Sequence, residues 1–89
     1  MGDLVAVFKV MPASPETDLD AIEDSVRSLV PADVELEQTE TEAVAFGLEA
    51  LMTTVSMPDS DEISADDMEQ DFAKIDGVES VECTDVGRL

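Results

Sequence analysis

The chain has 89 residues, 23 of them acidic and 4 basic, and a formal net charge of −19. This length fits one domain with one core, and an apolar content of 44% argues against a disordered acidic chain. So few basic residues nearly exclude a nucleic acid partner and argue against an anionic membrane surface, and no apolar run approaches the roughly 20 residues of a membrane span.

The first half of the chain predicts a strand, a helix and a second strand. Residues 4–11 alternate like a strand that is covered on one face. Apolar residues then recur at helical spacing, at Leu19, Ile22, Val26 and Leu29. Either Thr17 or Asp18 caps this helix, and Pro31 stops it. Residues 34–40 predict a strand with one solvent-facing side.

The second half predicts a strand, a helix and a last strand. A third strand runs from about residue 48 to residue 57. Ser64 then begins a weakened capping box before a stripe of core residues, Met68, Phe72 and Ile75. Gly77 fits the left-handed residue that closes a helix, and residues 78–86 form the last strand.

The predicted order β-α-β-β-α-β indicates an α+β fold of the ferredoxin-like, split β-α-β type. Four antiparallel strands would form one sheet, with two helices on one face, in a single domain over residues 1–89. The other face of the sheet, around Val5 and Val7, must then meet solvent or a partner.

Residues that could carry catalysis or bind a metal are sparse. The acidic stretch after Asp59 resembles a calcium loop, but Ile63, Ser64 and Gln70 occupy three demanding positions, so a solvated loop is the better interpretation. The chain has no histidine and no phosphate-binding glycine motif. Cys83 shares a strand face with Val81, which favours a core cysteine over a reactive thiol. We therefore expect no enzyme activity, metal or cofactor.

The acidic residues are spread along the whole chain and so would coat its surface. Such a surface repels itself in dilute salt, whereas at about 1 M salt the Debye length falls to roughly 3 Å. This composition favours a protein from a salt-accumulating halophile. The alternative is an ordinary acidic domain that binds a basic partner.

Three segments resemble the archaeal translation elongation factor 1-beta family. They are Phe-Lys-Val-Met-Pro at 8–12, Val-Ala-Phe-Gly-Leu-Glu-Ala-Leu at 44–51, and Val-Glu-Cys-Thr-Asp-Val-Gly-Arg-Leu at 81–89. Their order and spacing match over the whole chain. The resemblance implies a guanine nucleotide exchange factor that binds elongation factor 1-alpha and speeds GDP release. It also implies that the fold is a rigid platform for a few contacts. A short chain with one cysteine, and so no internal disulfide, independently favours a cytoplasmic protein.

The resemblance also implies which residues contact the GTPase. Phe46 matches an aromatic contact position, Gly47 lets the backbone turn there, and Leu48 continues the motif. The family commonly has Lys at the position of Glu49, so no charge-based contact is carried over to this residue.

The remaining implied contacts lie near the start and the end of the chain. Pro12 matches the end of the first strand, and Asp85 matches the tail motif. The eukaryotic relatives end on a longer tail with a penultimate Lys, for which Arg88 is the counterpart, although Arg and Lys differ in geometry and hydration. Exchange through the tail and exchange through the Phe46 loop both remain open.

Two other functions of the same fold stay as alternatives. One is a small-ligand regulatory or dimerisation module that uses the open sheet face around Val5 and Val7. The other is an acylphosphatase-like enzyme, which the absence of an arginine-lined phosphate cradle disfavours.

Overall fold

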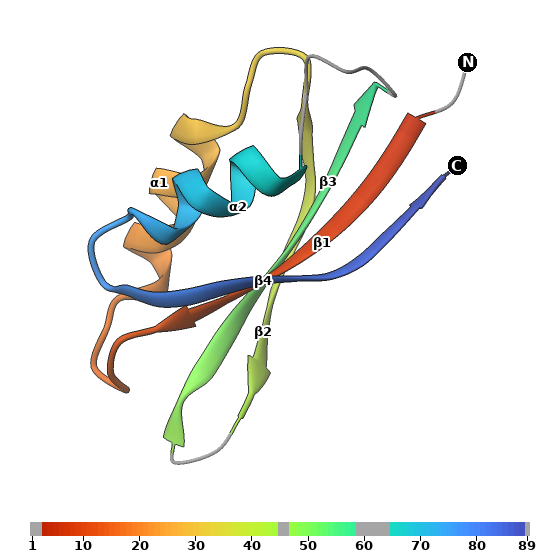
Figure 1. The fold of residues 1–89 in the computed structure, drawn as a ribbon. Helices are drawn as coiled ribbons and strands as arrows, with labels where there is room; N and C mark the ends of the chain where they lie inside the picture. Colours follow the sequence, from red (N-terminus) through yellow and green to blue (C-terminus); the bar gives the residue numbers. More distant parts are fainter. Residues whose placement is uncertain (1–2, 45–46, 59–64, 89) are drawn as a thin grey trace.

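The computed structural model describes residues 3–44, 47–58 and 65–88. These residues form, in chain order, β1 (Asp3–Pro12), α1 (Leu19–Leu29), β2 (Glu35–Ala43), β3 (Glu49–Pro58), α2 (Ala65–Ala73) and β4 (Val78–Arg88). All strand pairs are antiparallel, and the sheet order is β2-β3-β1-β4. Both helices cover one face of this sheet (Figure 1). The predicted α+β ferredoxin-like fold is therefore confirmed.

The β2–β3 hairpin is longer than the sequence pattern indicated. The second strand was predicted at 34–40, but β2 begins at Glu35 and continues to Ala43. Its last three residues pair with β3, ending with Ala43 opposite Glu49. Backbone hydrogen bonds extend the ladder here although the side chains no longer alternate between apolar and polar. The hairpin therefore projects past the part of the sheet that α1 covers (Figure 1).

Helix α1 begins at a single cap. The Asp18 side chain accepts hydrogen bonds from the backbone N–H groups of Asp20, at 3.0 Å, and Ala21, at 3.4 Å. This resolves the choice between Thr17 and Asp18. The Thr17 hydroxyl instead accepts a hydrogen bond from the Ser14 N–H and closes the preceding turn.

Helix α2 ends earlier than the glycine position suggested. The helix stops at Ala73, and Gly77 lies in the turn before β4 with a φ of +90°. The prediction of a left-handed glycine is confirmed, but its place at the helix end was wrong. The carbonyl of Gly77 accepts a hydrogen bond from the Ala13 N–H, which ties this turn to the end of β1. Ser64, the predicted cap, lies outside the described residues.

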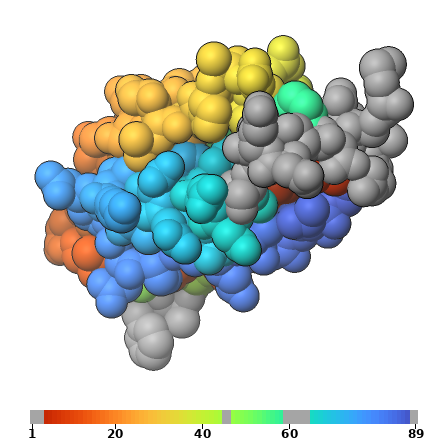
Figure 2. All heavy atoms as spheres, turned by 45° about the horizontal axis from the view of Figure 1, so that its top comes forward, coloured from red at the N-terminus to blue at the C-terminus, as the bar shows by residue number. Residues whose placement is uncertain are grey.

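The core lies between the helices and one face of β1 and β3. The side chains of Ala6, Phe8 and Val10 are all 0% exposed, as the strand alternation predicted. Phe8 meets Phe72 of α2 edge to face, with ring centroids 5.4 Å apart. Figure 2 shows α1 in orange and α2 in cyan forming the outer surface over this core. The two aromatic rings therefore join α2 to the central strand of the sheet.

Thr53 is a polar residue inside this core. Its side chain is 0% exposed, and its hydroxyl has no hydrogen-bond partner among the described residues. A buried hydroxyl without a partner costs about 1–3 kcal/mol of desolvation. Thr53 therefore lowers the stability of the fold.

We expect Thr53→Val to raise the free energy of unfolding by about 1 kcal/mol, because it removes the unpaired hydroxyl and keeps the shape of the side chain. Urea unfolding at fixed KCl concentration measures this change. The matched control is Thr54→Val, at the next and partly exposed position of β3, which should change stability by less than about 0.5 kcal/mol. A Thr53→Val protein less stable than the control would contradict the prediction.

Candidate partner-binding site

The turn of the β2–β3 hairpin carries the central motif of the implied contact. Gly47 is exposed and has a φ of +77°, a backbone conformation that favours glycine. The Leu48 carbonyl accepts a hydrogen bond from the Val44 N–H at 2.9 Å, which closes the turn. Leu48 is half-buried, and Phe46 lies outside the described residues. The structure therefore places Gly47 and Leu48 at an accessible tip of the sheet.

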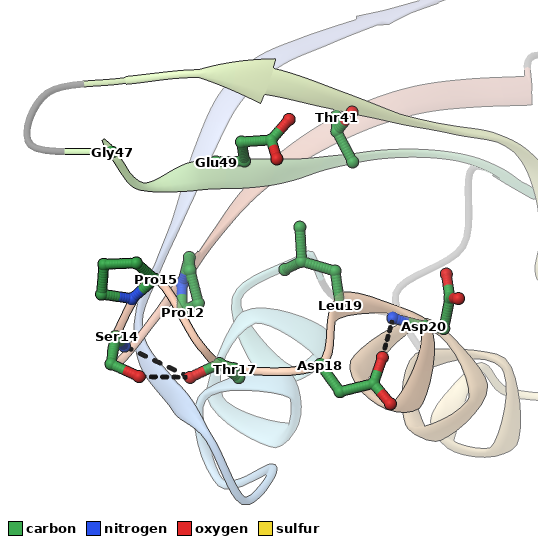
Figure 3. A pocket seen from close by; sticks show the side chains of 10 residues that line it. All are labelled: Pro12, Ser14, Pro15, Thr17, Asp18, Leu19, Asp20, Thr41, Gly47 and Glu49. Carbon is green, nitrogen blue, oxygen red and sulfur yellow. Dashed lines mark hydrogen bonds between the residues drawn. The ribbon is translucent and has the colours of Figure 1, made fainter.

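Pro12 lies at the same end of the molecule as this hairpin. It is the last residue of β1 and, although buried, it lines a groove together with Gly47 and Glu49 (Figure 3). The groove has a volume of about 320 Å³ and separates the hairpin from the β1–α1 connection. Two of the six implied contact residues, Pro12 and Gly47, are thus brought together although 35 positions separate them in the chain.

The last two implied contacts, Asp85 and Arg88, lie in β4; Asp85 pairs with Val7 near the middle of β1, and only Arg88 lies toward the far end of the sheet. In β4, Val78 pairs with Pro12, whereas Arg88 pairs with Leu4. Ten residues of strand separate Val78 from Arg88, which corresponds to about 30 Å. The longest dimension of the molecule is 42 Å, so the hairpin and the end of β4 lie far apart along it (Figure 1). The structure does not bring the hairpin and tail residues into one site.

A bulge in β4 decides which sheet face Asp85 occupies. Cys83 pairs with Phe8 and Asp85 pairs with Val7, so Thr84 is an extra residue in the ladder. The Thr84 hydroxyl donates to the Val7 carbonyl, at 3.4 Å. Without the bulge, strict alternation would have placed Asp85 on the same face as Cys83. With it, Asp85 is exposed and opposite a residue of the open face.

No pattern in the sequence predicted this bulge directly. The one available hint was chemical, because alternation alone placed the acidic Asp85 on the same face as Val81 and Cys83, which pack against the core. A side chain on the neighbouring helix supports the irregular backbone. The Glu69 carboxylate of α2 accepts a hydrogen bond from the Cys83 N–H at 2.9 Å.

Cys83 is a partly buried residue, as its pattern predicted. Burial raises the pKa of the thiol, and the nearby carboxylate of Glu69 raises it further. A raised pKa keeps the thiol protonated near neutral pH, so Cys83 is poorly suited to nucleophilic chemistry.

Glu23 links α1 to β2 on the helical side of the sheet. Its carboxylate accepts a hydrogen bond of 2.7 Å from the Thr39 hydroxyl and forms an ion pair of 3.2 Å with Arg27. Together these two contacts hold the pKa of the Glu23 carboxyl below its ordinary value. The hydrogen bond from Thr39 is the larger cause, and the contact with Arg27 is the smaller one. The ionised carboxylate of Glu23 therefore helps to hold α1 against the sheet.

Neither a metal-binding cluster nor a membrane-spanning helix is present in the described parts of the chain. Within residues 3–44, 47–58 and 65–88, no group of three His, Cys, Asp or Glu side chains could hold a metal ion. None of the described helices is long and apolar enough to cross a membrane. The beginning of the calcium-like stretch, residues 59–64, lies outside the described residues.

Comparison with known proteins gives the chain a family. Residues 5–89 match the model of the EF-1 guanine nucleotide exchange domain. The chain is 47% identical to elongation factor 1-beta of Halobacterium salinarum and 44% identical to that of Natronomonas pharaonis, over the full length of both proteins in each pair. It is 42% identical to elongation factor 1-beta of Methanothermobacter thermautotrophicus, over 99% of that protein.

The matched ranges include the hairpin, both helices and β4. They confirm the resemblance that the three sequence segments carried, and its extension to relatives from halophilic archaea. The family model also spans the two ends of the sheet where the implied contacts lie. The chain therefore belongs to the EF-1 guanine nucleotide exchange domain family.

Proposed function

We propose that the chain acts on elongation factor 1-alpha through two separate contact regions, one at the hairpin end of its sheet and one along the second half of β4. Members of this family are guanine nucleotide exchange factors, and the chain promotes GDP release from that GTPase. The hairpin region contains Phe46, Gly47, Leu48 and Pro12. The tail region contains Asp85 and Arg88.

The observation that carries this proposal is the separation of the two regions on a rigid frame. β1 pairs with both β3 and β4, so its backbone hydrogen bonds fix the hairpin and the end of β4 relative to each other. A partner that touches both ends must match a fixed span of about 30 Å. A rigid span of this kind favours one conformation of a bound GTPase over others.

Exchange follows from differential binding. Consider a factor that binds the nucleotide-free GTPase more tightly than it binds the GDP form. Such a factor lowers the affinity of the GTPase for GDP by the same ratio, because coupling between two ligands is reciprocal. In this scheme the hairpin region holds the partner, and the cation of Arg88 competes for the groups of the GTPase that surround the magnesium ion and the phosphates of bound GDP. No covalent bond forms or breaks on the factor, so the chain is not an enzyme in that sense.

In this proposal, residues 1–89 form one exchange domain, which works in the cytoplasm beside the ribosome. The main alternative was a ligand-binding or dimerisation module that uses the open face around Val5 and Val7. The family match and the names of the relatives support the exchange factor instead.

We expect the chain to accelerate the release of fluorescent GDP from its cognate elongation factor 1-alpha in about 2 M KCl, where surface charges are screened. Phe46→Ala should weaken the acceleration by removing the hairpin contact. Deleting Arg88 and Leu89 should weaken it by removing the tail contact. The measurement is the release rate after adding excess unlabelled nucleotide.

The GDP-release experiment needs a control variant that lies outside both proposed contact regions. Glu79→Gln changes an exposed residue of β4 that is not among the implied contacts, and it should leave the release rate unchanged. Loss of acceleration in only one of the two variants would reduce the proposal to a single contact region. No acceleration by a wild-type chain that circular dichroism shows to be folded would overturn it.

A further inference from the structure

The bulge in β4 is held by side chains on two sides of the strand. From α2, the Glu69 carboxylate accepts a hydrogen bond from the Cys83 N–H at 2.9 Å. Toward β1, the Thr84 hydroxyl donates to the Val7 carbonyl at 3.4 Å. Within β4, the Cys83 Sγ donates to the Asp85 carbonyl at 3.7 Å. β4 is an edge strand of the described sheet, so these side chains support it where a second neighbouring strand would otherwise do so.

The bulge sets the pairing register of the residues that follow it. With the bulge, Val86 pairs with Ala6, a residue of the buried sheet face. Were the ladder regular at this point, every later residue of β4 would move by one position, and Val86 would pair with Val5 of the open face. A slip by one residue moves each side chain of a strand to the other face of the sheet. The bulge therefore decides which face Asp85 occupies and which residue of β1 pairs with Arg88.

Burial of side chains does little to choose between the two registers. Val86 is 51% exposed although its partner Ala6 is 0% exposed, so the position that it occupies is largely open to solvent. In the regular register Asp85 would take this open position, which would bury no charge. Val86 would then lie opposite Val5, which is half-buried. Because the side-chain pattern specifies the register weakly, the hydrogen bonds at the bulge decide it.

Glu69 makes the strongest of these hydrogen bonds. A carboxylate that accepts from a backbone N–H forms a shorter and stronger bond than two neutral groups do, and its bond to Cys83 is the shortest of the three. The helix that carries Glu69 is itself fixed to the sheet, because Phe72 of α2 is 0% exposed and packs edge to face on Phe8. Glu69 thus connects the bulge to the core through a rigid helix.

We propose that Glu69 is a positioning residue for nucleotide exchange, because it fixes β4 at the bulge and so holds the tail region in its register. This inference rests on the proposed function and assigns a residue that supports one of its two contact regions. Glu69 acts through the pairing of β4 with β1. Without its carboxylate, the regular register competes and displaces Asp85 and Arg88 by one position, whereas the hairpin region is unchanged. The partner is then still bound, but the tail no longer acts on it in most complexes.

The test uses two variants of Glu69 and a matched control. Glu69→Ala removes the acceptor, and Glu69→Gln keeps an oxygen that can accept from the Cys83 N–H. Gln70→Ala shortens the next side chain of α2, which is exposed, and is the control. The measured quantities are the maximal rate of GDP release and the factor concentration that gives half-maximal release, in about 2 M KCl. Thermal midpoints and circular dichroism establish that each variant is folded.

We expect Glu69→Ala to lower the maximal release rate about fivefold and to change the half-maximal concentration by less than about twofold. Glu69→Gln should keep the maximal rate within about twofold of the wild type, and Gln70→Ala should match the wild type. Nuclear Overhauser contacts between backbone protons report the register directly. The contact between Val86 and Ala6 should weaken in Glu69→Ala, and a contact between Val86 and Val5 should appear.

A double variant tests whether Glu69 acts through the tail. Glu69→Ala is combined with deletion of Arg88 and Leu89, and the double variant should release GDP no more slowly than the deletion variant alone. A further loss in the double variant would overturn the positioning role, because Glu69 would then act by another route. Should Glu69→Ala fail to fold, Thr84→Val, which removes the hydroxyl contact of the bulge, takes its place in both comparisons with a smaller expected loss.

The remaining results separate this inference from the proposed function. Equal maximal rates for Glu69→Ala and the wild type, or equal losses in Glu69→Ala and Gln70→Ala, would overturn the positioning role and leave the exchange function standing. An equal loss in Glu69→Gln would attribute the effect to charge and would also overturn it. A tail deletion without effect would overturn the tail region and this inference together. No acceleration by the folded wild-type chain would overturn the proposed function itself.

Discussion

Replacing Phe72 with alanine is expected to lower the free energy of unfolding by about 3–5 kcal/mol. Phe72 is 0% exposed and meets Phe8 edge to face, with an angle of 88° between the two rings. Truncation would remove this contact and leave a cavity between α2 and β1. A domain of this size has a total stability of roughly 5–10 kcal/mol, so the loss is a large fraction of it.

Urea unfolding in about 2 M KCl measures the Phe72→Ala effect under screened conditions. The matched control is Phe72→Leu, which keeps an apolar side chain at the position and should cost clearly less than the alanine variant. A loss below about 1 kcal/mol for Phe72→Ala would show that α2 does not depend on this aromatic pair. Equal losses in the two variants would show that cavity size does not determine the cost.

Lowering the KCl concentration from about 2 M to about 0.05 M is expected to take the chain from mostly folded to mostly unfolded. The net charge of −19 is carried by 89 residues, and the 4 basic side chains are too few to pair with most of the 23 acidic ones. Most carboxylates therefore repel one another without compensation. Salt screens this repulsion in the compact state more than in the expanded chain, because charges lie closer together in the compact state.

Circular dichroism and thermal unfolding across the KCl series measure this dependence. A variant with Glu35, Glu40 and Glu42 changed to glutamine removes three exposed charges from the edge strand β2. It should stay folded at lower salt than the wild type. Sucrose at matched osmolality favours compact states without screening charge, so it should stabilise less than KCl. A thermal midpoint that does not change with salt would contradict the halophilic interpretation of the composition.

The acidic surface also affects how the chain associates with its partner. Long-range repulsion of other acidic proteins and attraction of basic surfaces both weaken as salt rises, so steering contributes little in about 2 M KCl. Contacts that operate under those conditions must be short-ranged and partly desolvated.

Local patterns in the sequence determined which segments form helices and strands. Period-two alternation in residues 4–11 identified β1 and its buried face, and the spacing of Ile22 and Val26 identified the buried stripe of α1. The order of these elements was enough to predict the ferredoxin-like fold. These features depend on residues that are close in the sequence, within one or two helical turns or along one strand. They can therefore be recognised from one sequence.

The family segments and the acidic composition could likewise be recognised without coordinates. They predicted the exchange function and the proposed contact residues, including Gly47 and Arg88. They did not give the spatial relation of those residues. Pro12 and Gly47 share a groove, whereas Arg88 pairs with Leu4 at the far end of β1.

Only the tertiary structure decided the length of the β2–β3 hairpin, the bulge at Thr84 and the groove between Leu19 and Glu49. Each of these features depends on backbone pairing or packing between residues far apart in the chain. Side-chain periodicity does not encode such pairing, because a ladder can continue through polar residues and can absorb an extra residue. The sequence thus determined the elements and the family, and long-range pairing determined where the contacts lie.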